Sequence, residues 1–310
     1  YNVDILILPS PFQPLFFRQD KNKQLTSCSR IASPLLRHRN LKALVQEPFH
    51  EKAGQFDFTE NGKGINVAFF VGCLVDKVFP DIAFSVMRSL EFFKAKVSVP
   101  PVQGCCGIPA LAAGDSDTFE RLVAHNVALF DAGEIDYLVT ACATCAATIV
   151  KWWPVLIKNS ALNEKVCLLS EKTVDINWLL ARRYNLSNLG KKQDSKENVT
   201  YHDPCHLKKS LDIADEPRRV IEASGYRLKE MDDSDTCCGM GGSFNLKHYD
   251  LSSEIGKKKA GSIIETGASI LATSCPACMM QLSDMLAKAN ADVRVCHPVQ
   301  LFSGSLDSGD

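Results

Sequence analysis

The sequence predicts an α/β fold of two duplicated, pseudo-symmetric lobes, each with a parallel sheet that presents cysteines at the ends of its strands. Three observations predict it. Ten of the thirteen cysteines form two copies of one spacing, C-x31-CC-x35-C-x2-C and C-x31-CC-x36-C-x2-C. Apolar segments of strand length end at these cysteines in both copies. Segments with helical spacing of apolar residues separate the strands, as is typical of parallel α/β units.

The composition is that of a globular protein with an ample core. The chain has 310 residues, of which 45% are hydrophobic and 23% charged. A net charge of −1 gives no broad electrostatic case for a nucleic-acid partner. The longest apolar run, residues 3–8, is interrupted by Asp4 and is far shorter than the roughly 20 residues that span a bilayer. No secretory signal is visible, so we expect a cytoplasmic protein.

Residues 1–64 precede the first copy of the pattern and are expected to form an N-terminal extension that contacts a partner. Residues 35–45 are basic and amphipathic, which predicts a helix that lies on a membrane surface, against a partner, or packed on the core. The chain begins with Tyr1 rather than Met. We therefore expect it to be processed, truncated, or the ordered part of a longer polypeptide.

The first lobe is expected over residues 65–186. Its predicted elements are a strand at 67–72 that ends at Cys73, a helix at 81–96, a helix at 117–132 and a strand at 136–141 that ends at Cys142. Each strand is a short apolar run, and each helix carries apolar residues at helical spacing. Two parallel strands that both end at a cysteine would place these thiols at one edge of the sheet.

The second lobe, expected over residues 199–302, repeats this order 132 or 133 residues later. Its predicted elements are a strand that ends at Cys205, helices at 216–224 and 250–266, and a strand that ends at Cys275. A polar linker at 187–198 joins the lobes, and the tail at 303–310 is expected to be disordered. Ligands of open parallel sheets bind beyond the carboxyl ends of the strands, which is where both cysteine sets are expected.

A glycine follows the adjacent cysteine pair in both lobes, as Gly107 and Gly239. A loop that wraps a cofactor needs positive φ and close backbone approach, which glycine permits. Its N–H groups can also donate to cofactor sulfurs. We therefore predict that both glycines belong to cofactor-binding loops, the alternative being an ordinary turn.

The cysteine count restricts the chemistry of each set. Disulfides are disfavoured because the total is odd and adjacent cysteines do not readily bridge to each other. Structural zinc takes four ligands, commonly from two C-x2-4-C pairs, whereas each lobe offers one such pair and five thiols. The tight cysteine run of a ferredoxin cubane does not occur. What remains is an iron–sulfur cluster that uses five cysteines, or four with one spare.

The two cysteine sets, with their repeated Cys-Cys-Gly, resemble the cysteine-rich CCG domain. It occurs in heterodisulfide reductase and in the iron–sulfur subunits of lactate, glycolate and glycerol-3-phosphate dehydrogenases. The resemblance covers about residues 66–300. It implies two non-cubane [4Fe–4S] clusters, one held by Cys73, Cys105, Cys106, Cys142 and Cys145, the other by Cys205, Cys237, Cys238, Cys275 and Cys278.

Residues 72–76 and 103–109 resemble the dehydrogenase branch of this family. The resemblance implies an electron-transfer subunit that relays electrons between a flavoprotein 2-hydroxyacid dehydrogenase, of the lactate or glycolate type, and quinone or another carrier. Many such proteins begin with a ferredoxin domain, which would precede Tyr1 or come from a ferredoxin-type partner. Peripheral membrane contact, at the inner face, would then occur through the complex. The alternatives are a disulfide reductase acting at a non-cubane cluster, as in heterodisulfide reductase, and a structural zinc protein.

Two histidines flank Cys205. His202 and His206 are candidates for donors to the cluster or for proton carriers in disulfide chemistry, the alternative being a simple loop cap. The first lobe has Phe70 at the position of His202, so substrate chemistry is expected at the second lobe.

Three cysteines lie outside the pattern, and a tryptophan pair follows the first C-x2-C. Cys28, Cys167 and Cys296 are expected to be small buried side chains. Trp152 and Trp153 are expected to pack in the core or to shield the cluster. No glycine-rich nucleotide fingerprint or P-loop occurs, so the sequence indicates no flavin or nucleotide site.

Overall fold

The computed structural model describes residues 39–42, 44–53, 64–186 and 197–306, together with the backbone of strands β1 (Phe17–Gln19) and β2 (Leu25–Ser27). The expectations for Cys28 and for residues 187–196 lie outside the described residues. Strands β1, β2 and β3 (Asn40–Leu41) form an antiparallel sheet that the sequence did not predict.

Two four-stranded sheets, both entirely parallel, confirm the predicted α/β fold. Their order is β5-β4-β6-β7 in the first lobe and β9-β8-β10-β11 in the second, so the lobes share one topology. The first comprises β4 (Asn66–Phe69), β5 (Lys96–Ser98), β6 (Tyr137–Thr140) and β7 (Thr173–Asp175). The second comprises β8 (Asn198–Tyr201), β9 (Arg227–Leu228), β10 (Ile270–Ala272) and β11 (Arg294–Cys296).

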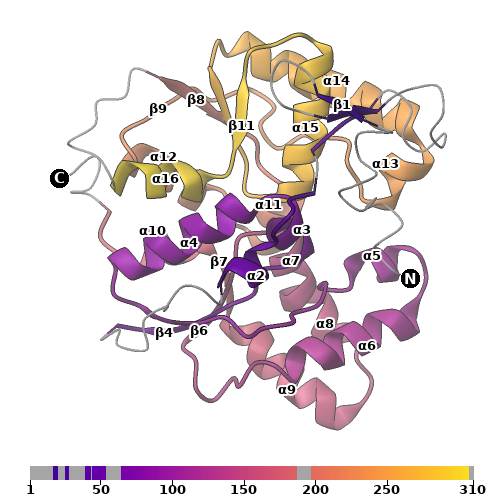
Figure 1. Ribbon diagram of the computed structural model, residues 1–310, viewed down its shortest axis with the longest axis vertical. Helices are drawn as coiled ribbons and strands as arrows, with labels where there is room; N and C mark the ends of the chain where they lie inside the picture. The colour runs from indigo at the N-terminus through magenta and orange to yellow at the C-terminus, as the bar shows by residue number, and fades with distance from the viewer. Residues whose placement is uncertain are drawn as a thin grey trace.

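Helices flank both sheets (Figure 1). Those before and within the first lobe are α2 (Phe49–Ala53), α3 (Cys73–Lys77), α4 (Pro80–Phe92), α5 (Ile108–Ala112), α6 (Ser116–Val127), α7 (Ala143–Ala147), the π-helix η4 (Thr148–Trp152), α8 (Trp153–Leu156), α9 (Ser160–Lys172) and α10 (Ile176–Arg183). Those of the second are α11 (Cys205–Leu211), α12 (Asp215–Ala223), α13 (Ser243–Lys247), α14 (Tyr249–Glu265), α15 (Pro276–Lys288) and α16 (Pro298–Ser305).

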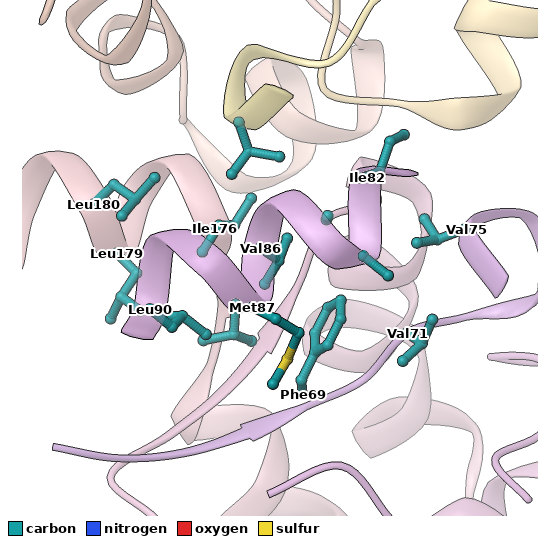
Figure 2. Close-up of a cluster of buried hydrophobic side chains, with 14 of the residues drawn as sticks. Phe69, Val71, Val75, Ile82, Val86, Met87, Leu90, Ile176, Leu179 and Leu180 are labelled. Atoms are coloured by element: carbon teal, nitrogen blue, oxygen red, sulfur yellow. The ribbon is translucent and has the colours of Figure 1, made fainter. Parts of the chain in front are cut away.

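The largest core cluster joins the two lobes. Figure 2 shows Ile82, Val86 and Leu90 of α4 packed near Ile176 and Leu180 of α10. The same cluster takes in second-lobe side chains from α12, α15 and α16, namely Val220, Met279, Val299 and Phe302. Burying a side chain of this size stabilises the fold by about 1.5–3 kcal/mol, so the shared core fixes the lobes against each other.

The lobes also meet in the middle of the molecule, where α7 of the first lies beside α11 of the second (Figure 1). A backbone hydrogen bond from Ala143 N to Ser274 O, 3.0 Å long, crosses this boundary. An ion pair between Arg182 and Glu216 crosses it as well, at 2.7 Å. The backbone hydrogen bond matters because Ala143 and Ser274 each adjoin a cysteine of the repeated pattern.

Three boundary predictions were wrong. The helix predicted at 81–96 ends at Phe92, because Lys94 adopts a left-handed φ of 59° and turns the chain into β5. The predicted amphipathic helix at 35–45 contains strand β3 within its described part. Helix α16 continues to Ser305, inside the expected disordered tail, because Leu301 and Phe302 are buried. Within the described part of the chain, no helix is both long and apolar enough to cross a bilayer.

Candidate metal centres

The carboxyl ends of the strands deliver the first cysteine set. Cys73 begins α3 directly after β4, and Cys142 caps α7 directly after β6. Cys145 lies one turn into α7, and the loop after β5 carries Cys105 and Cys106. The predicted strand-end placement is therefore confirmed.

The second set repeats this placement. Cys205 begins α11 after β8, Cys275 caps α15 after β10, and Cys278 lies one turn into α15. The loop after β9 carries Cys237 and Cys238. All twelve cysteines in the described ranges are free thiols.

The glycine after each cysteine pair has positive φ, as predicted. Gly107 has φ of 94°, and an added Cβ would lie 2.7 Å from the Phe119 ring. Gly239 has φ of 88°, and an added Cβ would lie 2.4 Å from Ser252 O. The Gly239 N–H donates to the Cys237 sulfur at 3.3 Å. The loop thus places a backbone donor against a thiol of the set.

Within the first set the thiols crowd one another. The sulfurs of Cys73 and Cys105 are 3.8 Å apart. Hydrogen bonds from Cys106 and then Cys73 hold the pKa of Cys105 at about 3, and the interaction with Cys105 raises the pKa of Cys106 to about 12. One thiolate therefore forms easily, and its neighbours resist ionisation because they would lie beside an anion.

The second set shows the same asymmetry. The sulfurs of Cys238 and Cys278 are 3.2 Å apart. Hydrogen bonds from Cys237 and then Cys278 hold the pKa of Cys238 well below its usual value, while the interaction with Cys238 raises the pKa of Cys278. All five cysteines of a set can ionise together only beside a cation that offsets their mutual repulsion. Iron supplies this charge and prefers thiolate ligands. The donor set therefore fits an iron–sulfur cluster in each lobe.

The two sets meet at the lobe boundary. Interaction with Cys142 of the first set, and then with Cys278, lowers the pKa of Cys275 in the second. The Thr144 hydroxyl lies 3.4 Å from the Cys275 sulfur and 3.0 Å from Nδ1 of His206. The sequence could not reveal this contact, because it depends on how the lobes dock.

Access from solvent differs between the sets. Three cysteines are buried in each set. The sets differ at the first cysteine of the adjacent pair, since Cys237 is exposed whereas Cys105 is partly buried. The second centre is therefore the more open of the two to an external molecule.

The two histidine candidates face different surroundings. His202 is buried, and a ring nitrogen lies within 4.8 Å of the sulfurs of Cys238 and Cys278. His206 instead bridges the lobes through Thr144. Of the two, only His202 lies in a group with the geometry of a metal site within the described ranges.

Several side chains support the loops in ways the sequence did not signal. Gln103 donates to Phe69 O and accepts from Val71 N, which ties the first cysteine loop to β4. Asn126 donates to Cys105 O at 2.9 Å. The buried Trp153 donates from Nε1 to Cys106 O at 2.9 Å, so its predicted core role is confirmed, whereas Trp152 is 44% exposed.

The cysteines outside the pattern behave differently from one another. Cys296 is buried, as expected, and burial raises the pKa of its thiol to about 12. Cys167 is only partly buried, which departs from the expectation of a buried side chain there. Its thiol lies on α9, 3.5 Å from Asn163 Oδ1.

The cysteine-rich domain model matches residues 67–150 and 199–283, once in each lobe. The chain is 32% identical over 282 residues to one subunit of the fumarate reductase (CoM/CoB) of Methanothermobacter marburgensis, which covers 89% of this chain and 54% of that protein. It is 28% identical to the "Probable glycolate oxidase iron-sulfur subunit" of Bacillus subtilis, over 70% of this chain and 49% of that protein. It is 27% identical to the "Lactate utilization protein A" of Shouchella clausii, over 77% of this chain and 99% of that protein.

The chain thus spans about half the length of the fumarate reductase and glycolate oxidase relatives. The family match covers both lobes and all ten patterned cysteines. The chain belongs to the cysteine-rich (CCG) domain family of iron–sulfur proteins.

Proposed function

We propose that this chain is an electron-transfer subunit of an oxidoreductase complex, with one [4Fe–4S] cluster of non-cubane type in each lobe. The ligands would be the five patterned cysteines of each set. The clusters supply one-electron redox chemistry when bound. The protein's own part is to hold the thiolates at the strand ends, to bury most of them, and to set the surroundings of each centre.

The observation that carries this proposal is the contact between the two sets. Thr144, which lies between Cys142 and Cys145, is 3.4 Å from the Cys275 sulfur, so the two centres would be neighbours. Each centre would accept one electron and pass it on, and adjacency favours such exchange. A pair of structural metal sites would gain nothing from this proximity.

For the partner, we propose a flavoprotein dehydrogenase that oxidises a 2-hydroxyacid, with quinone or another carrier as acceptor. The relatives named for glycolate oxidase and lactate utilization support this assignment. The flavin would release electrons singly to the chain, and no hydride would reach the cysteines. A ferredoxin-type iron–sulfur protein is a second proposed contact, and membrane association would occur through the complex.

The test is an anaerobic redox titration followed by electron paramagnetic resonance. Two neighbouring centres should reduce in successive one-electron steps, and their signals should broaden when both are paramagnetic. The Cys238→Ser variant should lose the signal of one centre and the broadening of the other. A Cys167→Ser variant, which changes a thiol outside the sets, should match the unchanged protein. Two independent signals without mutual broadening would refute the relay.

Disulfide reduction is a second candidate, favoured by the exposure of Cys237. A disulfide would take two electrons, one from each centre, and with two protons release two thiols. Adding a mixed disulfide to the reduced protein should then yield free thiols in proportion to the electrons supplied. Quantitative recovery of the disulfide would remove this candidate and leave the relay.

A further inference from the structure

The second lobe holds a row of buried side chains whose polar atoms include some without a hydrogen-bond partner in the described part of the chain. His202, Thr273 and His297 follow the ends of the adjacent strands β8, β10 and β11. The unpaired atoms are both ring nitrogens of His202, Oγ1 of Thr273 and Nε2 of His297. Native proteins seldom leave buried polar groups unpaired, and each such group calls for a bound partner or a functional reason.

Strand register places these three side chains on one face of the sheet. Ala272 lies opposite both Tyr201 and Cys296. The register continues for one more residue, since His202 N donates to Ala272 O and Thr273 N donates to Cys296 O. Residues opposite one another in a sheet point to the same side. The row therefore forms a continuous polar strip.

The strip faces the second cysteine set. A ring nitrogen of His202 lies within 4.8 Å of the sulfurs of Cys238 and Cys278. Burial lowers the pKa of His297 to about 3, against an opposing effect of the nearby Cys275. Leu271, on the same face as Thr273, packs in one cluster with these cysteines. The unpaired groups thus lie on the side of the sheet that carries the second cysteine set.

The protonation of His297 follows from its contacts. Its Nδ1 accepts a hydrogen bond from Val299 N at 3.1 Å and so caps α16. Because the ring is fully buried and neutral, the proton must be on Nε2, which becomes a donor without an acceptor. An acceptor sulfur would complete this histidine's bonding.

Within its described residues, the first lobe carries a shorter row, in which Oγ1 of Thr140 and Oδ2 of Asp175 are also buried without hydrogen-bond partners. The same register there places Phe70, Thr140 and Asp175 in the corresponding positions, since Phe70 N donates to Val139 O and Thr140 pairs with Asp175. Phe70 packs in one cluster with Cys106, Cys142 and Cys145, so a phenyl ring takes the place of the His202 imidazole. Asp175 caps α10 as His297 caps α16. Lobe two therefore offers two imidazoles where lobe one offers a phenyl ring and a carboxyl.

We propose that His202, Thr273 and His297 donate hydrogen bonds to sulfurs of the second centre, and that the two imidazoles, which the first lobe lacks at these positions, set its reduction potential above that of the first. The inference rests on the proposed function, in which each set holds a cluster. Donors to cluster sulfurs stabilise the more negative, reduced state. Electrons entering the chain would then settle at the second centre, the one with the exposed Cys237.

The experiment exchanges the two equivalent side chains. In His202→Phe, we expect the equilibrium constant for reduction of one centre to fall about tenfold, which is 59 mV for a one-electron couple. In Phe70→His, we expect the equilibrium constant for reduction of the first centre to rise by a similar factor. Potentials are read from redox titrations of the anaerobic protein, monitored by electron paramagnetic resonance.

Two milder variants keep the test decisive if the exchange disturbs folding. Thr273→Val keeps the side-chain shape, and His297→Ser keeps a helix-capping oxygen while it removes the Nε2 donor. Both variants, like His202→Phe, should lower the reduction potential of the second centre. Thr140→Val should change the reduction potential of the first centre only. Wild-type protein without clusters would refute the proposed function. Full iron content with unchanged potentials in Thr273→Val and His297→Ser would overturn the inference alone.

Discussion

Replacing Gly239 with alanine tests how the second cysteine loop is held. An added Cβ would lie 2.4 Å from Ser252 O and 3.1 Å from Gly256 N, and both are backbone atoms of α14. Neither can move without displacing the helix. The positive φ of 88° adds a backbone cost of about 1–2 kcal/mol for any residue with a Cβ. Overpacking of this kind adds about 1–3 kcal/mol, so Gly239→Ala should lower the free energy of unfolding by about 2–5 kcal/mol in total.

Gly267→Ala is the matched control. Gly267 also lies in the second lobe with a positive φ of 65°, but an added Cβ there would meet nothing within 4 Å. It should therefore show only the backbone cost of about 1–2 kcal/mol. The difference between the two variants isolates the contact between the Cys237–Cys238 loop and α14.

The assay is urea unfolding of anaerobically purified protein, with iron measured in the same samples. We expect Gly239→Ala to have a lower midpoint than Gly267→Ala at an unchanged slope, and to retain less iron in the second centre. Equal midpoints and equal iron in the two variants would show that the close approach of Gly239 to Ser252 has no consequence for stability or cluster retention.

Three further predictions concern the first lobe and the boundary between lobes. Trp153→Phe should lower the free energy of unfolding by about 1–3 kcal/mol, because it leaves the carbonyl of Cys106 without its hydrogen-bond donor. Thermal unfolding measures this loss. The control Trp152→Phe, at an exposed position, should lose far less. Burial raises the pKa of Asp175 to about 7, so its contribution to stability is complete below pH 4 and is lost as the pH rises through 7. Asp175→Asn, which retains a capping side chain, should therefore unfold at higher urea than the unchanged protein at pH 8 and keep only a small part of that advantage at pH 5; a pH-independent difference would contradict the assignment. Glu216→Gln removes the charge that pairs with the half-exposed Arg182, and it should lower the free energy of unfolding in urea by less than about 1 kcal/mol. A larger loss would show that this pair, rather than the shared core, holds the lobes together.

Much of the fold followed from the repeat itself. The strands that end at Cys73, Cys142, Cys205 and Cys275 were predictable because each is an apolar run that stops at a cysteine. The short strands β7 and β11 were not predicted, because three residues between two helices carry too little periodicity. The π-helical turn η4 likewise has no counterpart in a pattern of apolar spacing.

The site shows the same division. The ten cysteines and both glycines lie in one sequence pattern, so their placement at strand ends and in the loops could be predicted from spacing. The polar strip could not, because His202 and His297 are far apart in sequence and become neighbours only through the strand between them. The contact between Cys142 and Cys275 depends on the docking of two lobes, which the core shared by α4, α10 and α16 determines.

Iron and sulfide analysis of the anaerobically purified protein shows whether each lobe holds a four-iron cluster. Two four-iron clusters predict about eight iron and eight acid-labile sulfide per chain, with brown colour. Alanine at Cys237 or Cys238 should reduce both values by about half, whereas alanine at Cys296 should leave them unchanged. Colourless protein that contains zinc and no sulfide would contradict the account.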